Sequence, residues 1–208
     1  MSGQRTRLIL WRHGQTDWNA QSRFQGQSDV PLNETGRAQA SQAAAVLAEL
    51  PVAAIYASTL SRAQVTAGVL AELVELPVRL DARLREIDVG SWEGLTLDSV
   101  RADNPEFAAA MAAGRDFRRS PEGETSVETG VRVGQALLDI AANHAGETVV
   151  VTGHGLAIRM ATAELLGWDH SAAVQLGGMQ NCGWTTLETK PGQGWRLITW
   201  NQLAHGAR

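Results

Sequence analysis

The sequence has a single cysteine, no long apolar run and no excess of positive charge. One cysteine cannot form an internal disulfide, which is typical of proteins from reducing compartments. No apolar stretch approaches the about 20 residues that span a membrane, and the N-terminus MSGQRTR lacks the apolar segment of a signal peptide. A net charge of -4 argues against a non-specific nucleic-acid binder but permits a local basic pocket for a small anion. We therefore expect a cytoplasmic protein that binds neither membrane nor nucleic acid.

Strand-like and helix-like segments alternate along the chain, and its 208 residues suit one domain, 1–208. Short apolar runs predict strands, and apolar residues at helical spacing predict helices. The alternation predicts an α/β three-layer sandwich, in which a mostly parallel sheet has helices on both faces and an antiparallel hairpin at one edge. The expected strands cover 8–11, 53–57, 78–80 and 148–152, and the hairpin 182–188 and 195–201. Helices are expected after the N-cap Asn33 to near Pro51, over 60–74, 127–143 and 155–166, and as two short pieces in 96–113, with a loop at 84–94.

Polar residues follow several of these strands directly, where open α/β sheets bind ligands. His13 stands between Arg12 and Gly14 after the first strand, and His154 stands between two glycines after the run 148–152. The right-handed crossover rule allows both strand ends to lie side by side. Arg62, early in its helix, and Glu86, in the loop after the third strand, are also near strand ends. The sequence therefore predicts a site with two arginines, two histidines and one carboxylate.

This residue set suits phosphoryl transfer. Two guanidiniums can clamp a phosphate through paired charge-assisted hydrogen bonds, and a neutral imidazole can attack phosphorus as a covalent nucleophile. A carboxylic acid near phosphate oxygens is kept protonated by the negative charge, can protonate the leaving alkoxide, and can then activate water. Glu86 can fill this role, with Glu124 or Glu122 as the next candidates.

Other reactive residues carry weaker signals. Taken alone, each arginine, Glu86 or His154 reads as a solvated or structural residue, so the interpretation depends on their joint placement. His144, His170 and His205 have no matching context, and Cys182 reads as a packed core residue. The histidines show no metal-ligand spacing such as H-E-x-x-H, so no metal or other cofactor is expected. Trp18 and Trp92 are expected to border the pocket.

The motifs together resemble the histidine phosphatase superfamily, which includes the cofactor-dependent phosphoglycerate mutases. The matching segments, in the family's order, are RHGQTDWN, RFQG at 23–26, PLNETGRAQA, S-x-L-x-R-A-x-x-T-A over 58–67, LREIDVGSWEG and VTGHG. The resemblance covers most of residues 6–160. It implies that His13 is the phosphohistidine nucleophile, that Arg12 and Arg62 hold the phosphoryl group, that His154 completes the pocket and that Glu86 donates the proton. It further implies that the pocket is lined by Asn19, Gln25, Gly26 and Gly155.

Three functions remain open on this resemblance: hydrolysis, phosphoglycerate mutation and non-catalytic binding of phosphorylated ligands. Family mutases are usually longer and carry an arginine- and proline-rich insertion before the second histidine, where this chain has only GRDFRRSPEGETS. A binding module would normally lack a reactive residue, and none is missing here. The acid-phosphatase branch has an aspartate after the second histidine, but Gly155 occupies that position, which favours Glu86 as the acid. We therefore expect metal-independent hydrolysis of a phosphate monoester.

The tail adds a hint about the substrate. LGGMQN at 176–181, followed by CGWTTLE and WRLITWN, resembles the C-terminal segment of glucosyl-3-phosphoglycerate phosphatases, which belong to the same superfamily. The alternative is that this tail is only an edge hairpin. The resemblance implies a small phosphorylated metabolite, with Arg115, Arg118 or Arg119 meeting a glycerate carboxylate. The sequence also resembles broad-specificity phosphatases of this superfamily. A homodimer is possible from the sequence alone.

Overall fold

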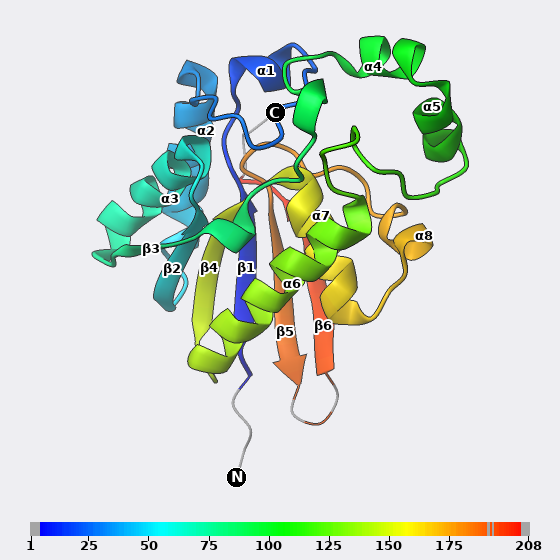
Figure 1. Cartoon of the computed structure of the whole chain (residues 1–208). Coiled ribbons are helices and arrows are strands. Elements are labelled where there is room, and N and C mark those ends of the chain that lie inside the picture. The colour runs from blue at the N-terminus through cyan, green and yellow to red at the C-terminus, as the bar shows by residue number, and fades with distance from the viewer. Residues whose placement is uncertain (1–4, 191, 193, 205–208) are drawn as a thin grey trace.

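The computed structural model describes residues 5–190, 192 and 194–204 and is built on a six-stranded sheet (Figure 1). The strand order is β3-β2-β4-β1-β5-β6, with the first four strands parallel and β5 and β6 antiparallel. This arrangement confirms the predicted mostly parallel sheet with an antiparallel hairpin at one edge. Residues 191 and 193 of the expected hairpin turn lie outside the described part of the chain. The strands are β1 (Arg7–Arg12), β2 (Val52–Ser58), β3 (Val78–Asp81), β4 (Thr148–Gly153), β5 (Trp184–Lys190) and β6 (Gly194–Gln202).

The two central strands are buried on both faces. All six residues of β4 are buried, and so are the four central residues of β1. Successive residues of a strand point to opposite faces, so Ile9 and Leu10 of β1 enter two different core clusters. This two-sided burial explains why both strands read as continuous apolar runs in the sequence.

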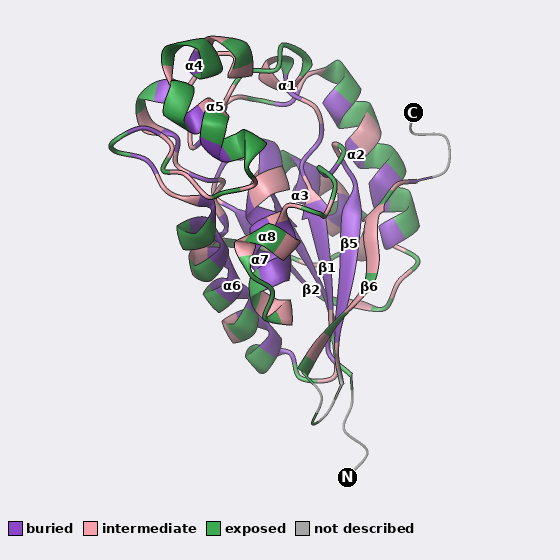
Figure 2. Cartoon of the chain, turned by 90° about the vertical axis from the view of Figure 1, so that its right-hand side faces the viewer, coloured by how far each residue is buried: buried purple, intermediate pink, exposed green. Residues whose placement is uncertain are grey.

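Helices cover both faces of the sheet and form the predicted three layers (Figure 2). α2 (Glu34–Leu47) and α3 (Ser61–Val74) pack Leu47 and Leu70 on the face that receives Ile9. α6 (Ser126–Asn143) and α7 (Gly155–Leu166) pack Leu137 and Ile158 on the other face. Asn33 caps α2 as predicted, since its side chain accepts a hydrogen bond from the Gly36 amide. Within the described residues, no helix is long and apolar enough to cross a membrane.

A small cap lies over the carboxyl end of the parallel strands (Figure 1). It contains the two short helices that the Asn104-Pro105 break predicted, α4 (Leu97–Asp103) and α5 (Pro105–Ala112). Its own apolar cluster, centred on Trp92 and Phe107, is separate from the two sheet cores. This cluster fixes the cap above the strand ends, where a ligand would bind.

Four short elements were not expected from the sequence. The predicted loop at 84–94 is wrong in detail, because 3₁₀ turns form at Ala82–Leu84 and Gly90–Trp92. The one-turn helices α1 (Asp17–Ala20) and α8 (His170–Ala173) also escaped prediction. Elements of three or four residues are too short to show apolar periodicity. The capping box between Thr16 and Asn19 is the local interaction that stabilises α1.

The register of β1 and β4 brings the two predicted histidines together. Arg12 is paired with Gly153, so the residues that follow, His13 and His154, leave the sheet side by side. The loop after His13 then crosses the first turn of α2 at very short range. A Cβ atom on Gly14 would overlap the Gly36 carbonyl, and a Cβ atom on Gly36 would overlap the backbone of Gln15. Glycine at both positions therefore holds the His13 loop against α2.

Replacing Gly36 by alanine should destabilise the protein, because the new methyl group must push the Gln15 backbone away. We expect Gly36→Ala to lower the free energy of unfolding by about 1–3 kcal/mol and to lower kcat, because the displaced loop carries His13. Gly68 is the matched control, since it also lies in a helix but a Cβ there meets nothing within 4 Å. Gly68→Ala should stabilise the protein by about 1 kcal/mol through helix propensity. Urea unfolding of both variants checks this, and equal effects would contradict the crossing.

Candidate active site

His13 lies at the carboxyl end of β1 with its backbone held on both sides. Its amide donates to the Gly153 carbonyl at 3.0 Å, and its carbonyl accepts from the Cys182 amide at 3.2 Å. The imidazole Nδ1 lies 2.6 Å from the Gly14 carbonyl, which can only accept, so Nδ1 carries the proton. Burial, followed by the charges of Arg62 and Arg12, lowers the pKa of His13 well below its usual value. The ring is therefore neutral at pH 7, with an unprotonated Nε2.

Two buried guanidiniums flank this imidazole. Arg12 donates to the Met179 carbonyl, and Arg62 donates to the carbonyls of Ser28 at 2.7 Å and Gly26 at 2.9 Å. In both arginines the buried Nε has no partner among the described residues. Burial lowers the pKa of Arg62 to about 10, so its guanidinium stays charged at neutral pH. Glu86 is the main negative charge near both guanidiniums, but neither forms an ion pair among the described residues, so both are able to hold a phosphate.

His154 completes the cluster from the end of β4. Its ring centroid lies 5.2 Å from that of His13, and its Nε2 lies 2.8 Å from Ser58 Oγ. Its Nδ1 is buried without a partner in the described part of the chain. Burial, followed by the nearby charge of Arg62, lowers the pKa of His154 well below its usual value. Both imidazoles are therefore neutral, and His154 Nδ1 joins the two arginine Nε atoms as a third buried nitrogen without a partner among the described residues.

Glu86 reaches the same place from the loop after η1 (Ala82–Leu84), and its carboxylate lies at the N-terminus of α7. Oε1 accepts from the amides of Ala157 at 2.9 Å and Ile87 at 3.0 Å, whereas Oε2 has one donor among the described residues, the Leu156 amide at 3.2 Å. The positive end of the helix dipole favours a carboxylate at this position. Oε2 is the less committed oxygen and is the one best able to exchange a proton.

A cavity of about 320 Å³ joins these groups under the cap. Among the described residues, its wall contains five arginines and one carboxylate, so it is strongly positive although the whole chain carries -4. A second depression, of about 500 Å³, borders the other side of Arg12 but contains no histidine or carboxylate, so we place the site in the smaller cavity. Of the predicted residues, seven line the smaller cavity: Arg12, His13, Asn19, Gln25, Gly26, Arg62 and Glu86.

The two predicted residues outside this wall touch it indirectly. His154 lies against His13, as described above. Gly155 begins α7 beside Arg12, and a Cβ there would lie 3.2 Å from the arginine Nε. Glycine thus leaves room for the guanidinium. The structure therefore brings all nine predicted site residues together, though their roles stay predictions.

Two of the polar predicted residues have their side-chain oxygens held by the protein. Asn19 Oδ1 accepts from the Thr16 amide at 3.1 Å and from Asn181 Nδ2 at 3.2 Å. Gln25 Oε1 accepts from the Thr16 hydroxyl at 3.0 Å. Both residues line the cavity, and their amide NH₂ groups, which are donors, take no part in these contacts, which suits an anionic ligand.

Several cavity residues were missed by sequence reasoning. Arg23 and Arg159 line the wall, as do the apolar cap residues Phe107 and Met111. Arg159 lies four residues after Gly155, one turn along α7, so helical spacing from the VTGHG motif could have identified it. The cap residues come from a region that the motifs do not cover, and only the fold places them over the site.

Of the three arginines expected to meet a carboxylate, only Arg119 lines the cavity. Arg118 instead forms an ion pair with Glu128, and Arg115 is absent from the described wall. Arg119 Nη2 donates to Ser126 Oγ at 2.9 Å, and its guanidinium lies 5.3 Å from the Phe107 ring centroid. Burial lowers the pKa of Arg119, and the nearby charge of Arg159 lowers it further. These two cations therefore share one wall of the cavity.

The remaining sequence candidates lie elsewhere. Glu124 forms an ion pair with Arg132 at 2.7 Å and does not line the cavity, nor does Glu122. Trp92 lies behind the wall, with its ring 4.8 Å from that of Phe107, and Trp18 is also absent from the lining. Burial raises the pKa of Cys182 to about 12, so its thiol is protonated and unreactive. His205 lies outside the described residues.

The structural histidines have protein partners. His144 Nδ1 lies 2.7 Å from Glu147 Oε2, and His170 Nδ1 lies 3.2 Å from the Gly114 carbonyl. Across the described ranges, no group of three or more histidine, cysteine, aspartate or glutamate side chains is set to hold a metal ion.

Comparison with known proteins agrees with this geometry. The sequence model of the histidine phosphatase superfamily, branch 1, matches residues 8–203. The glucosyl-3-phosphoglycerate phosphatase of Mycobacterium tuberculosis (strain CDC 1551 / Oshkosh) is 39% identical over 214 residues, covering 95% of each chain. A probable phosphoglycerate mutase of Enterobacter sp. (strain 638) is 33% identical over 202 residues, covering 95% of this chain and 94% of that protein.

Solved structures show the same relation. The structure of a mycobacterial glucosyl-3-phosphoglycerate phosphatase in complex with VO3 is 39% identical and superposes with a TM-score of 0.85. That superposition covers 94% of this chain and 98% of the other. The family resemblance inferred from the motifs is thereby confirmed: this chain belongs to branch 1 of the histidine phosphatase superfamily.

Proposed function

We propose that the protein is a metal-independent phosphomonoester hydrolase that acts through a phosphohistidine on His13. The observation that carries this proposal is the neutral His13 ring, whose unprotonated Nε2 belongs to the same cluster as the buried Arg12 Nε, Arg62 Nε and His154 Nδ1. A phosphate held by these groups would be placed for attack by the imidazole. The 39% identical relative named as a phosphatase supports the same reading.

In the first step, His13 Nε2 forms a bond to phosphorus while the bond to the ester oxygen breaks. The leaving oxygen takes a proton from Glu86, which acts as the general acid beside the bound phosphate. Arg12 and Arg62 stabilise the charge on the transferring phosphoryl group. The products of this step are an alcohol, a phosphorylated His13 and an ionised Glu86.

In the second step, water attacks phosphorus and gives a proton to the Glu86 carboxylate, and the nitrogen–phosphorus bond breaks. His13 returns to its neutral form and inorganic phosphate leaves. The positive charge that the transition state needs comes from arginines already present in the cavity wall, so no metal ion has to supply it. The site residues of the sequence prediction thus have complementary roles in one catalytic cycle.

The alternative is a mutase, in which a bound phospho-acceptor rather than water takes the phosphoryl group. The 33% identical relative named as a probable phosphoglycerate mutase keeps this candidate open. The short segment between Glu86 and His154 favours hydrolysis, as does the higher identity to the phosphatase. The ratio of free phosphate to phosphorylated product separates the two activities.

For the substrate, we propose esters that contain phosphoglycerate, glucosyl-3-phosphoglycerate among them. Arg119 and Arg159 share the cavity wall, and Arg159 Nε is buried without a partner among the described residues. A carboxylate between these two guanidiniums would relieve their mutual repulsion and accept charge-assisted hydrogen bonds. The name of the mycobacterial relative agrees with this chemistry. We also propose that residues 1–208 form one domain. We further propose a cytoplasmic location, because that compartment contains small phosphorylated metabolites and keeps thiols reduced.

The phosphoenzyme provides the test of the proposed function. Substrate labelled in its phosphoryl group, quenched in alkali with a chelator present throughout, should leave label on the wild-type protein because phosphohistidine survives alkali. His13→Gln should carry no label and should lose at least about 10³-fold in kcat, since a glutamine amide is no nucleophile. His144→Gln, a histidine with structural partners only, should keep both. Label on the His13 variant, or loss of wild-type label with chelator, would overturn the proposal.

The substrate proposal is tested with 3-phosphoglycerate and glycerol 3-phosphate, which differ in the carboxylate. We expect Arg159→Met to lower kcat/KM for 3-phosphoglycerate by about 10–100-fold, the loss of one charge-assisted hydrogen bond. Glycerol 3-phosphate should lose less than about 3-fold. Arg118→Met is the control, because Arg118 pairs with Glu128 outside the cavity. Equal losses on both esters would show that Arg159 does not read the carboxylate.

A further inference from the structure

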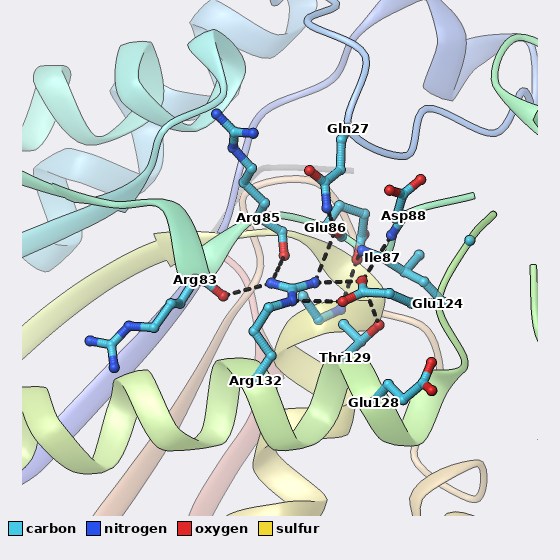
Figure 3. Close-up of polar contacts among 12 residues, drawn as sticks. Gln27, Arg83, Arg85, Glu86, Ile87, Asp88, Glu124, Glu128, Thr129 and Arg132 are labelled. Atoms are coloured by element: carbon cyan, nitrogen blue, oxygen red, sulfur yellow. Dashed lines mark hydrogen bonds and ion pairs between the residues drawn. The ribbon is translucent and has the colours of Figure 1, made fainter. Parts of the chain in front are cut away.

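Arg132 of α6 grips the loop that carries Glu86 (Figure 3). Its Nη1 donates to the carbonyls of Arg83 at 2.6 Å and Arg85 at 3.0 Å, and its Nη2 lies 3.3 Å from the Glu86 carbonyl. The other two contacts go to Glu124, with Nε to Oε1 at 2.8 Å and Nη2 to Oε2 at 2.7 Å. All five donors of the guanidinium are therefore used.

Glu124 holds the far side of the same loop. Its Oε2 accepts from the Asp88 amide at 3.0 Å, and its own amide donates to the Asp88 carbonyl at 2.8 Å. The Thr129 hydroxyl, one turn before Arg132 on α6, donates to Oε2 at 3.2 Å. Arg132 thus binds carbonyls of the segment before Glu86. Glu124 binds the amide and the carbonyl of Asp88 after it, so the pair holds the segment 83–88 on both sides of the acid.

The Arg132–Glu124 ion pair is partly shielded from solvent, so its geometry contributes to holding the loop. The side chains of Arg132 and Glu124 are 23% and 22% exposed, so solvent screens them only in part. Burial raises the pKa of Glu124, but hydrogen bonds from Arg132 and the Asp88 amide outweigh it and hold that pKa below its usual value. Glu124 is therefore ionised at neutral pH, which suits an anchor and not the proton donor for which the sequence made it a candidate.

Arg132 and Glu124 together form a clamp on the Glu86 loop. Helix α6, which carries Arg132, packs against α7, the helix that receives the Glu86 carboxylate. Gly130 and Gly134 of α6 bring that helix close to α7, since Cβ atoms there would lie 3.1 Å from Met160 Cβ and 2.7 Å from Glu164 Cγ. α6 thus holds the backbone of Glu86, and α7 receives its carboxylate at the amides of Leu156 and Ala157. The same pair of packed helices therefore fixes both the backbone and the side chain of Glu86.

We infer that Arg132, with Glu124, is a positioning residue that sets Glu86 for proton transfer to the leaving group. This inference rests on the proposed function, in which Glu86 is the acid. A displacement of about 1 Å in a reacting group can cost about 10²-fold in rate. Because phosphate binds to the arginines and histidines at the strand ends, loss of the clamp should weaken proton transfer and leave phosphate binding intact.

The test compares an alkyl phosphate, whose leaving group needs a proton, with an aryl phosphate, whose leaving group needs little help. Arg132→Met should lower kcat by about 10²-fold on the alkyl ester and by less than about 10-fold on the aryl ester. The inhibition constant of inorganic phosphate should change less than about 3-fold. Arg7→Met is the matched control, because Arg7 also forms an ion pair with a glutamate, Glu188, but at the opposite end of β1. It should not change the alkyl-to-aryl ratio.

A double-mutant cycle separates positioning from general structural damage. If Arg132 acts through Glu86, then Arg132→Met added to Glu86→Gln should cost less than about 3-fold more on the alkyl ester. A full additional 10²-fold loss, or equal losses on both esters in the single variant, would overturn the inference. Glu86→Gln alone reports on the proposed function, because equal losses on both esters in that variant would mean that Glu86 is not the acid.

Circular dichroism and thermal unfolding show whether each variant folds. If Arg132→Met does not fold, Arg132→Lys and Glu124→Gln carry the test. Lysine keeps the charge but cannot match the two-pronged geometry, so it should shift the alkyl-to-aryl ratio in the same direction by a smaller factor. An unchanged ratio in both of these folded variants would contradict the inference.

Discussion

Positive charge buried at the carboxyl end of a parallel sheet is the constraint on which this structure depends. Arg12 and Arg62 stand beside two imidazoles that burial keeps neutral, and buried cations without an ion pair among the described residues are costly. In the proposed mechanism a phosphate dianion relieves this cost, and the same burial keeps the proposed nucleophile His13 neutral. The fold supplies the rigidity: β1 and β4 lie in fixed register, and the His13 loop is pressed against Gly36.

Hydrogen bonds within the same buried cluster determine which atoms of His13 and Glu86 remain available to a substrate. The His13 proton is held by the Gly14 carbonyl, which leaves Nε2 unprotonated, as the proposed attack on phosphorus requires, and Oε2 of Glu86 accepts one hydrogen bond, from the Leu156 amide, among the described residues. In the proposed mechanism, water or a phospho-acceptor takes the phosphoryl group from His13. The cap residues Phe107 and Met111 and the cations Arg119 and Arg159 line the cavity in which that step would occur.

The core of the site could be predicted from sequence because its residues follow strands. Apolar runs that end in Arg12-His13 or Gly153-His154 identify both the strand and its ligand-binding end, and the motif order supplied the family. The clamp on Glu86 could not be predicted, because Arg132 acts on backbone carbonyls that carry no sequence signal. For a related reason, the sequence could offer Glu124 only as the next candidate acid after Glu86, because its partner Arg132 is known only from the structure. Arg159 could have been found from helical spacing along α7, whereas the cap residues Phe107 and Met111 depend on how α5 sits over the sheet, which local periodicity does not report.

In the proposed mechanism the phosphoryl group is transferred twice, first to His13 and then to water. The stereochemistry at phosphorus tests it most directly, by hydrolysing a thiophosphate ester made chiral with oxygen isotopes in water that carries a third oxygen isotope. Each in-line displacement inverts the configuration, so two displacements predict net retention in the thiophosphate product. Net inversion would mean that water attacks the substrate directly, and the account of His13 as nucleophile would be wrong.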